Sequence, residues 1–191
     1  AAKDASLIIL SDYAKGAITE NVIAAAIAAG RAHGIPVIAD PKGLDFARYG
    51  EVDLLKPNAM ELGQAIGLAV ETDRDATDAL ARAMDLLPAR AIVVTRAAKG
   101  MSFVQRDGTV MHRSGEAREV YDVSGAGDTS IAALALGLAA GGSLAEAVEL
   151  AIAASGIAVG KSGTATVSAN ELTTALQMGL RNGGVSHVPL E

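Results

Sequence analysis

The fold of this chain is decided by the stretch Asp122-Val123-Ser124-Gly125-Ala126-Gly127-Asp128-Thr129, a glycine-rich turn that opens directly into an apolar helix from Ile131 to Ala140. Three small residues, Gly125 to Gly127, let the backbone approach a ligand closely. Consecutive amides at a helix N-terminus form a ready anion site. Asp128, in the first turn, would repel a phosphate that is merely bound. A carboxylate at this place makes chemical sense if it accepts a proton while a phosphoryl group is transferred nearby.

A purely structural interpretation of this stretch is also open. Asp128 would stabilise the helix dipole, and the glycines would only make a turn. For an isolated Gly-x-Gly-Asp string that interpretation would be preferred. Here the lead-in Tyr121-Asp122 and the long Ala/Leu helix behind the turn favour a functional one.

Composition narrows the class of protein. The 191 residues suit one domain with a sizeable core, and half of them are apolar, with two Phe and no Trp. Sixteen basic and twenty-two acidic residues give a net charge of −6, which argues against nucleic-acid binding. The absence of Cys excludes disulfides and thiolate metal sites and is compatible with the cytoplasm. The longest apolar run is too short to span a membrane, so we expect a cytoplasmic protein without membrane contact.

Short aliphatic runs alternate with helical patterns along the chain. The expected strands are Leu7–Leu10, Val37–Pro41, Asp53–Pro57 and Ala91–Thr95, then a hairpin of Ser102–Arg106 and Thr109–Arg113 around Asp107-Gly108. The expected helices are Ile18–His33, Ala59–Ile66, Thr77–Leu87 and about 126–140, 144–160 and 169–180, with capping boxes at Ser143/Glu146 and Ser168/Glu171 and an interhelix loop over Glu71–Asp75. This order predicts an α/β fold with a mainly parallel sheet and helices on both faces. Ligands of such sheets bind beyond the carboxyl ends of the strands, where Asp12, Asp40, Asn58 and Thr95 fall.

The string Lys56-Pro57-Asn58-Ala59-Met60-Glu61 places an Asn and a Glu three residues apart at a helix start. Asn58 is a good N-cap and Glu61 its capping-box partner. The functional alternative is that Asn58 and Glu61 hold Mg²⁺, or its waters, because oxygen ligands with retained waters suit that ion. Both interpretations can hold together.

These segments resemble the ribokinase-like (PfkB) carbohydrate kinases. The resemblance implies a ribokinase-like three-layer fold, ATP and Mg²⁺ as cofactors, Asp128 as catalytic base, and an anion hole made by the amides of Gly125, Ala126 and Gly127. It also implies a nucleotide and metal site at Asn58, Ala59, Met60 and Glu61, with the metal at Asn58 and Glu61.

Two further segments acquire a role through the same resemblance. Thr95 and Gly100 would contact the ATP phosphates, with added charge from Arg96 and Lys99; the alternative is an exposed basic loop. The run from Ser155 to Ser162 looks like the end of a P-loop, but Ser155 stands where that motif requires Gly. The resemblance instead places Ala154, Gly156 and Ile157 beside the adenine pocket; the alternative is a packing surface of small residues.

Four strings narrow the resemblance to the bacterial D-glycero-D-manno-heptose 7-phosphate kinases, which serve ADP-heptose synthesis for lipopolysaccharide: Ser11–Gly16, Asp40–Gly43, Val94–Arg96 and Lys161–Ser168. It covers Leu7 to about Leu180 and implies transfer of the γ-phosphoryl group of Mg·ATP to the anomeric hydroxyl of a sugar phosphate. Asp40 and Lys42 would touch nucleotide or sugar phosphate; a turn enforced by Pro41 is the alternative.

The family's N-terminal portion, with the lid and most sugar contacts, has no counterpart here. We therefore expect residues 1–191 to be a single domain, the C-terminal portion of a ribokinase-like kinase domain truncated at the N-terminus, inactive by itself and homodimeric in the full-length protein. His33, His112 and His187 lie too far apart for the His-x-Gly-His motif of a nucleotidyltransferase and are interpreted as surface residues. The alternatives are another sugar kinase of this fold, or a catalytically silent nucleotide-binding or oligomerisation module.

Overall fold

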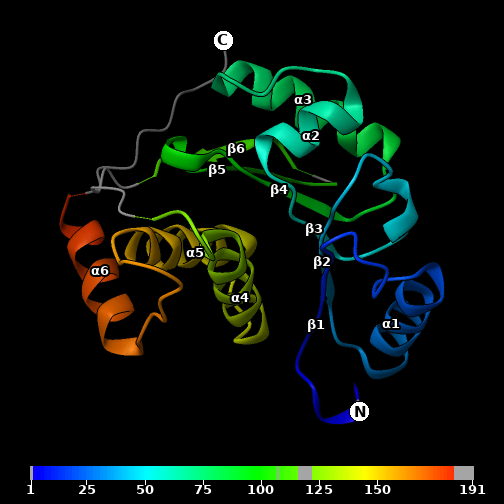
Figure 1. Cartoon of the computed structure of the whole chain (residues 1–191), viewed down its shortest axis with the longest axis horizontal. Helices are drawn as coiled ribbons and strands as arrows, with labels where there is room; N and C mark the ends of the chain where they lie inside the picture. The colour runs from blue at the N-terminus through cyan, green and yellow to red at the C-terminus, as the bar shows by residue number, and fades with distance from the viewer. Residues whose placement is uncertain (1, 107, 116–121, 183–191) are drawn as a thin grey trace.

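The computed structural model describes residues 2–106, 108–115 and 122–182. They contain a six-stranded sheet whose strands follow one another in chain order (Figure 1). The strands are β1 (Ile8–Ser11), β2 (Val37–Asp40), β3 (Leu54–Leu55), β4 (Ala91–Thr95), β5 (Met101–Gln105) and β6 (Met111–Arg113). β1 to β4 are parallel, whereas β5 and β6 run antiparallel to their neighbours. The expected α/β fold with a mainly parallel sheet is confirmed.

Helices cover both faces of the sheet and make three layers (Figure 1). One face carries α1 (Glu20–His33), α2 (Ala59–Ile66) and α3 (Asp73–Leu86); the other carries α4 (Ala126–Ala139) and α5 (Leu144–Val159), and α6 (Ala169–Asn182) packs on α5. The short 3₁₀ helices are η1 (Ala2–Asp4), η2 (Ala47–Tyr49) and η3 (Ala97–Lys99). Along β4, Ile92 points into one core and Val93 into the other. Burial on both sides explains why β2, β3 and β4 are largely aliphatic.

The first turn of α3 differs from the expectation. The helix begins at Asp73, not at Thr77, because Thr72 and Asp75 form a capping box. Thr72 Oγ1 accepts from the amide of Asp75 at 3.1 Å, and Asp75 Oδ2 accepts from the amide of Thr72 at 2.8 Å. The expected loop over Glu71–Asp75 is therefore wrong for Asp73 to Asp75, which form the first turn of the helix, and the spacing Thr72-x-x-Asp75 is the signal for it.

The other boundaries differ by one or two residues. α1 begins at Glu20 because Thr19 is its N-cap, and its side chain accepts from the amide of Val22. β5 and β6 form the expected antiparallel hairpin, in which Phe103 lies opposite Met111. The turn expected at Asp107-Gly108 falls in part outside the described residues. Within the described ranges, the helices are all too short or too polar to cross a bilayer.

Candidate active site

The N-terminus of α4 has an unusual start. Its N-cap is Gly125 with φ 80°, a left-handed conformation that suits glycine, and no side chain of the described residues caps the helix. Asp122 shapes the preceding turn, since its Oδ1 accepts from the amide of Ser124 at 2.8 Å. The amide of Asp122 donates to the carbonyl of Val159 at 3.1 Å, so the turn is fixed to the end of α5.

Asp128 lies exposed in the first turn of α4 and meets the loop after β1. The hydroxyl of Tyr13 donates to Asp128 Oδ1 at 2.5 Å across 115 residues of sequence. This bond raises the pKa of Tyr13, because the carboxylate favours the protonated phenol. The Tyr13 side chain is itself 57% exposed, so the pair lies at an open surface. Sequence reasoning included Tyr13 only in a motif string and missed this contact.

The loop that carries Tyr13 is anchored to the rest of the protein by the side chain of Asp12. This carboxylate is buried; Oδ1 accepts from the amide of Ala14 at 2.8 Å, and Oδ2 accepts from the hydroxyl of Tyr49 at 2.7 Å. Arg48 adds an ion pair at 3.3 Å. Burial and the hydrogen bond to Asp12 raise the pKa of Tyr49 to about 12. Asp12 therefore shapes the loop, in which Ala14 has φ 55°.

Three carboxylates share the carboxyl edge of the sheet. Burial raises the pKa of Asp40, the ion pair with Lys56 at 3.2 Å opposes this rise, and the negative charges of Glu61 and Asp128 add to it. Lys42 Nζ donates to Glu61 Oε1 at 2.5 Å, a contact that raises the pKa of Lys42. The edge thus balances clustered acids with two lysines, which is a suitable setting for an anionic ligand that brings a cation with it.

The expected capping box at the start of α2 is present. Asn58 Oδ1 accepts from the amide of Glu61 at 2.9 Å, and Glu61 Oε2 accepts from the amide of Asn58 at 2.9 Å. Each carboxylate oxygen has two lone pairs, so Glu61 retains acceptor capacity beside Lys42. Among the described residues no three acidic or histidine side chains cluster as a metal cage. The donor set fits Mg²⁺ bound through waters and phosphates, not a closed protein site. Of the two residues between them, Met60 is exposed and Ala59 is half-buried.

The loop between β4 and β5 lies next to α2. The amide of Thr95 donates to the carbonyl of Pro57 at 3.1 Å, and a bridge pairs Asn58 with Thr95. Gly100 has φ 84°, and a Cβ there would lie 2.1 Å from the carbonyl oxygen of Arg113. No other residue fits this position without moving the backbone.

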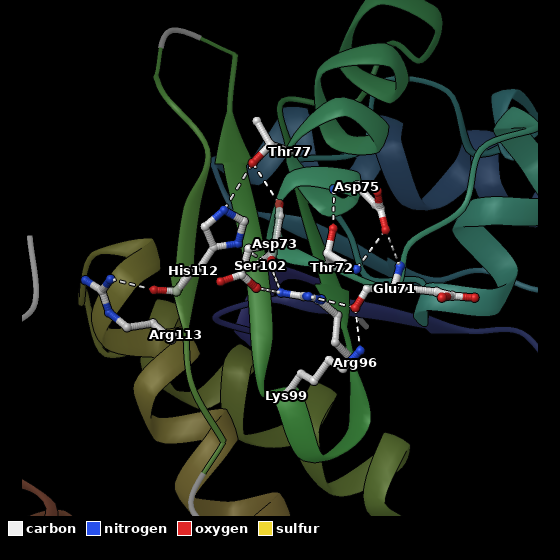
Figure 2. A network of polar contacts seen from close by, with 10 residues as sticks. All are labelled: Glu71, Thr72, Asp73, Asp75, Thr77, Arg96, Lys99, Ser102, His112 and Arg113. Atoms are coloured by element: carbon white, nitrogen blue, oxygen red, sulfur yellow. Dashed lines mark hydrogen bonds and ion pairs between the residues drawn. The ribbon is translucent and has the colours of Figure 1, made fainter. Parts of the chain in front are cut away.

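Both cations expected in this loop have protein acceptors, although Lys99 is exposed. Arg96 is buried and ion-paired with Asp73, and Lys99 donates to the carbonyl of Glu71 at 2.5 Å (Figure 2). The alternative of an exposed basic loop is wrong for Arg96. The reason is tertiary: the N-terminus of α3 lies against this loop and supplies acceptors for both side chains.

Residues expected beside an adenine lie on α5. Ala154 packs in the core between α4, α5 and the sheet, and Ile157 packs against Ala175 of α6. Both side chains are buried, and their place beside a nucleotide stays a prediction. Of the histidines, His33 is exposed as expected, whereas His112 is half-buried and hydrogen-bonded, which corrects the surface interpretation. His187 lies outside the described residues.

Hollows of the described surface lie at both ends of the sheet. One, of about 330 Å³, is lined by residues 11–13, 15, 17 and 18 and lies beside Tyr13. Another, of about 560 Å³, is lined by Glu51, residues 85–88, Arg90 and Arg106, at the amino end of β4. The hollow of about 560 Å³ contains none of the expected site residues, whereas the one of about 330 Å³ includes Tyr13, the hydrogen-bond partner of Asp128.

Comparison with known proteins gives a consistent result. The sequence model of the family described as "pfkB family carbohydrate kinase" matches residues 1–171 of this chain. The "Bifunctional protein HldE" of Hyphomonas neptunium is 55% identical over 190 residues, which are 100% of this chain and 39% of that protein. The protein of the same name from Gluconacetobacter diazotrophicus is 51% identical over 90% of this chain and 36% of its own length. The chain thus spans less than two fifths of either relative.

Solved structures agree with the fold. Arabidopsis thaliana ribokinase, complexed with ribose and ATP, superimposes with a TM-score of 0.81 and 26% identity, over 92% of this chain and 57% of that one. Phosphofructokinase-2 from Escherichia coli, in complex with potassium, gives a TM-score of 0.77 at 23% identity, over 90% of this chain and 56% of that one. The ribokinase-like fold expected from the sequence is confirmed.

Proposed function

The chain belongs to the pfkB family of carbohydrate kinases, and on that premise we propose that residues 1–191 are the C-terminal portion of a kinase domain that phosphorylates D-glycero-D-manno-heptose 7-phosphate at its anomeric hydroxyl. The observation that carries the proposal is the start of α4, an uncapped glycine turn with Asp128 exposed at the carboxyl edge of the sheet. The choice of sugar is supported by the heptose-kinase strings in the sequence and by identity above 50% with two proteins named HldE.

The chemistry assigned to α4 is proton removal and charge stabilisation. Asp128 accepts the proton of the attacking hydroxyl. The amides of Gly125, Ala126 and Gly127 stabilise the negative charge that develops on the phosphoryl oxygens. Tyr13 holds Asp128 Oδ1 by its 2.5 Å hydrogen bond, so we assign Oδ2 to the acceptor hydroxyl.

The nucleotide is assigned to the adjoining loops. Thr95 and Gly100 contact the phosphates of ATP, Ala59 and Met60 line the same site, and Ala154 and Ile157 border the adenine. Asn58 and Glu61 would hold Mg²⁺ through waters. When bound, the ion neutralises charge on the transferring phosphates.

Turnover with a panel of sugars tests this proposal. ADP release by the complete protein with Mg·ATP is measured with heptose 7-phosphate, fructose 6-phosphate and ribose. The highest kcat/KM is expected for heptose 7-phosphate. Preference for another sugar would mean that the protein is a kinase with a different substrate. Nucleotide binding without turnover of any sugar would favour the alternative of a catalytically silent nucleotide-binding module.

The chain of 191 residues by itself is proposed to be inactive, because orienting the acceptor is a large share of this catalysis and the sugar-holding residues are expected upstream. Equal kcat/KM for this chain and for one extended upstream would overturn the proposal that the 191 residues are inactive by themselves. We also propose a cytoplasmic homodimer for the complete protein, which size-exclusion chromatography and cell fractionation test.

A further inference from the structure

Arg96 is a buried cation at the start of the β4–β5 loop. Its side chain is 2% exposed. Nη1 donates to Asp73 Oδ1 at 2.5 Å and to Ser102 Oγ at 3.0 Å, and Nη2 donates to the carbonyl of Glu71 at 3.3 Å (Figure 2). Nε has no partner among the described residues. Burying a guanidinium costs free energy even when it is paired. The salt bridge with Asp73 therefore does not by itself explain why Arg96 is buried against the N-terminus of α3.

The contacts of Ser102 and His112 extend the network in one direction. Ser102 Oγ accepts from Arg96, so its proton is free to go to His112 Nδ1, 2.7 Å away. On the other side of the ring, Nε2 lies 3.1 Å from Thr77 Oγ1, and that hydroxyl donates to the carbonyl of Asp73 at 3.0 Å. Each hydroxyl thus donates once and accepts once. The neutral imidazole with its proton on Nε2 satisfies both contacts and also gives the hydroxyl proton of Ser102 an acceptor.

The network fixes a loop with strained backbone. Ala97 has φ 50°, which is uncommon for a residue with a Cβ. The amide of Arg96 donates to the carbonyl of Gly100 at 2.8 Å and closes the loop, while its side chain and that of Lys99 both reach the carbonyl of Glu71. Strained conformations persist where the surroundings over-determine them, and they gather at ligand sites.

We propose that Arg96 is the positioning residue of the Thr95–Gly100 loop, and that neutral His112 completes its support through Ser102. The inference rests on the proposed function, in which Thr95 and Gly100 contact the phosphates of ATP. Arg96 does not touch the nucleotide. It holds the backbone that does, from the far side of the loop.

Protonation of His112 disrupts this arrangement. A proton on Nδ1 would face Ser102 Oγ, which already accepts from Arg96, and would leave the hydroxyl proton of Ser102 without its acceptor. The charged groups that face the ring are Asp73 from α3 and Arg96 from the loop. Burial lowers the pKa of His112 below 6.5, Asp73 opposes the change, and Arg96 adds to it. The network is therefore intact at neutral pH and loosens as the pH falls.

The first test replaces the cation. In the complete protein, Arg96→Gln is expected to raise the KM for Mg·ATP about tenfold, because hydrogen bonds to a charged group are lost, with kcat and the KM for sugar changed less. The matched control is Arg90→Gln, at the other end of β4, where the side chain is exposed. An unchanged KM for Mg·ATP in a folded Arg96→Gln protein overturns the proposal.

The second test removes the titration and holds even if Arg96→Gln fails to fold. His112→Asn keeps an acceptor near the place of Nδ1 but cannot be protonated. The wild-type KM for Mg·ATP is expected to rise below pH 6.5, the ordinary pKa of histidine, more steeply than that of His112→Asn. Protonation of ATP itself affects both proteins alike. The exposed His33→Asn is the control and should follow the wild type; a His112→Asn profile identical to wild type overturns the role of His112.

The results for the three variants distinguish a failure of the positioning role of Arg96 from a failure of the proposed function. If Asp128→Asn abolishes turnover while Arg96→Gln and His112→Asn behave like wild type, only the positioning role fails. If Asp128→Asn retains turnover, the proposed role of Asp128 as the base fails, and if the unmodified protein turns over none of the sugars, the proposed function fails. A readout without activity is the imidazole ¹⁵N spectrum at about pH 7, which should show the proton of His112 on Nε2. A proton on Nδ1 contradicts the network.

Discussion

α4 and α5 carry an acidic residue at the same place, the third helical position, and use it in opposite ways. In α5, Glu146 Oε2 accepts from the amide of Ser143 at 2.8 Å, and Ser143 Oγ accepts from the amide of Glu146 at 3.3 Å. In α4 the cap is Gly125, which has no side chain to offer, and Asp128 receives a hydrogen bond from Tyr13. The comparison teaches that an acid committed to its own helix stabilises structure, and an acid released from the cap is available for chemistry.

α2 lies between these two cases. Glu61, again at the third position, closes a capping box with Asn58 and also accepts from Lys42. One carboxylate oxygen thus serves the helix while the other faces the carboxyl edge of the sheet. The acid at the third position caps the helix in α5, both caps and contacts Lys42 in α2, and is the proposed base in α4. Substitutions at these three helix N-termini should therefore differ in their effect on turnover.

The largest effect is expected at α4. Asp128→Asn in the complete protein should lower turnover by about 10²- to 10⁴-fold, the usual contribution of a positioned base, with ATP binding nearly intact because the size of the side chain is kept. Steady-state kinetics and nucleotide titration measure both. Glu146→Gln is the matched control and should retain turnover. Wild-type rates for Asp128→Asn would make Asp128 a helix-dipole residue only.

The next effect concerns the partner of that acid. Tyr13→Phe should lower kcat about tenfold, because a hydrogen bond to a charged group is lost, without raising the KM for Mg·ATP. Ultraviolet titration checks the same contact: Asp128→Asn should lower the pKa of Tyr13 toward 10.0, since Asp128 is the main cause of its raised value. Unchanged kcat in Tyr13→Phe would show that the pair is incidental.

A smaller effect is expected at α2. Glu61→Gln should raise the Mg²⁺ concentration for half-maximal rate severalfold, because Gln still closes a capping box but has no charge. The rate is measured against Mg²⁺ at saturating ATP, beside thermal unfolding. A wild-type Mg²⁺ requirement together with a lower melting temperature would support capping alone.

The smallest kinetic effect is expected at α5. Ser143→Ala should destabilise the folded state by about 1 kcal/mol, the usual cost of losing an N-cap, and leave kcat and both KM values unchanged. Urea unfolding followed by circular dichroism gives the stability. A marked loss of turnover in a folded Ser143→Ala protein would erase the distinction between the two helix starts.

Local pattern was a good guide where neighbours in sequence make the contacts. The boxes at Asn58/Glu61, Ser143/Glu146 and Ser168/Glu171 form as their three-residue spacing predicts. The box at Thr72/Asp75 has the same spacing, although the run of polar residues there is typical of a loop. Capping depends on residues within one turn, so spacing alone predicts it.

The amino-acid sequence by itself determined the α/β class, most of its elements and the glycine turn before Asp128, because strand and helix periodicity, turn residues and caps are short-range properties. Only the tertiary structure decided that Tyr13 meets Asp128, that Arg96 turns under α3, and that His112 joins Ser102 to Thr77. These contacts join residues up to 115 positions apart. They arise because the carboxyl ends of β1 and β4 and the N-termini of α3 and α4 lie at one edge of the sheet. No local sequence pattern encodes which side chains will meet there.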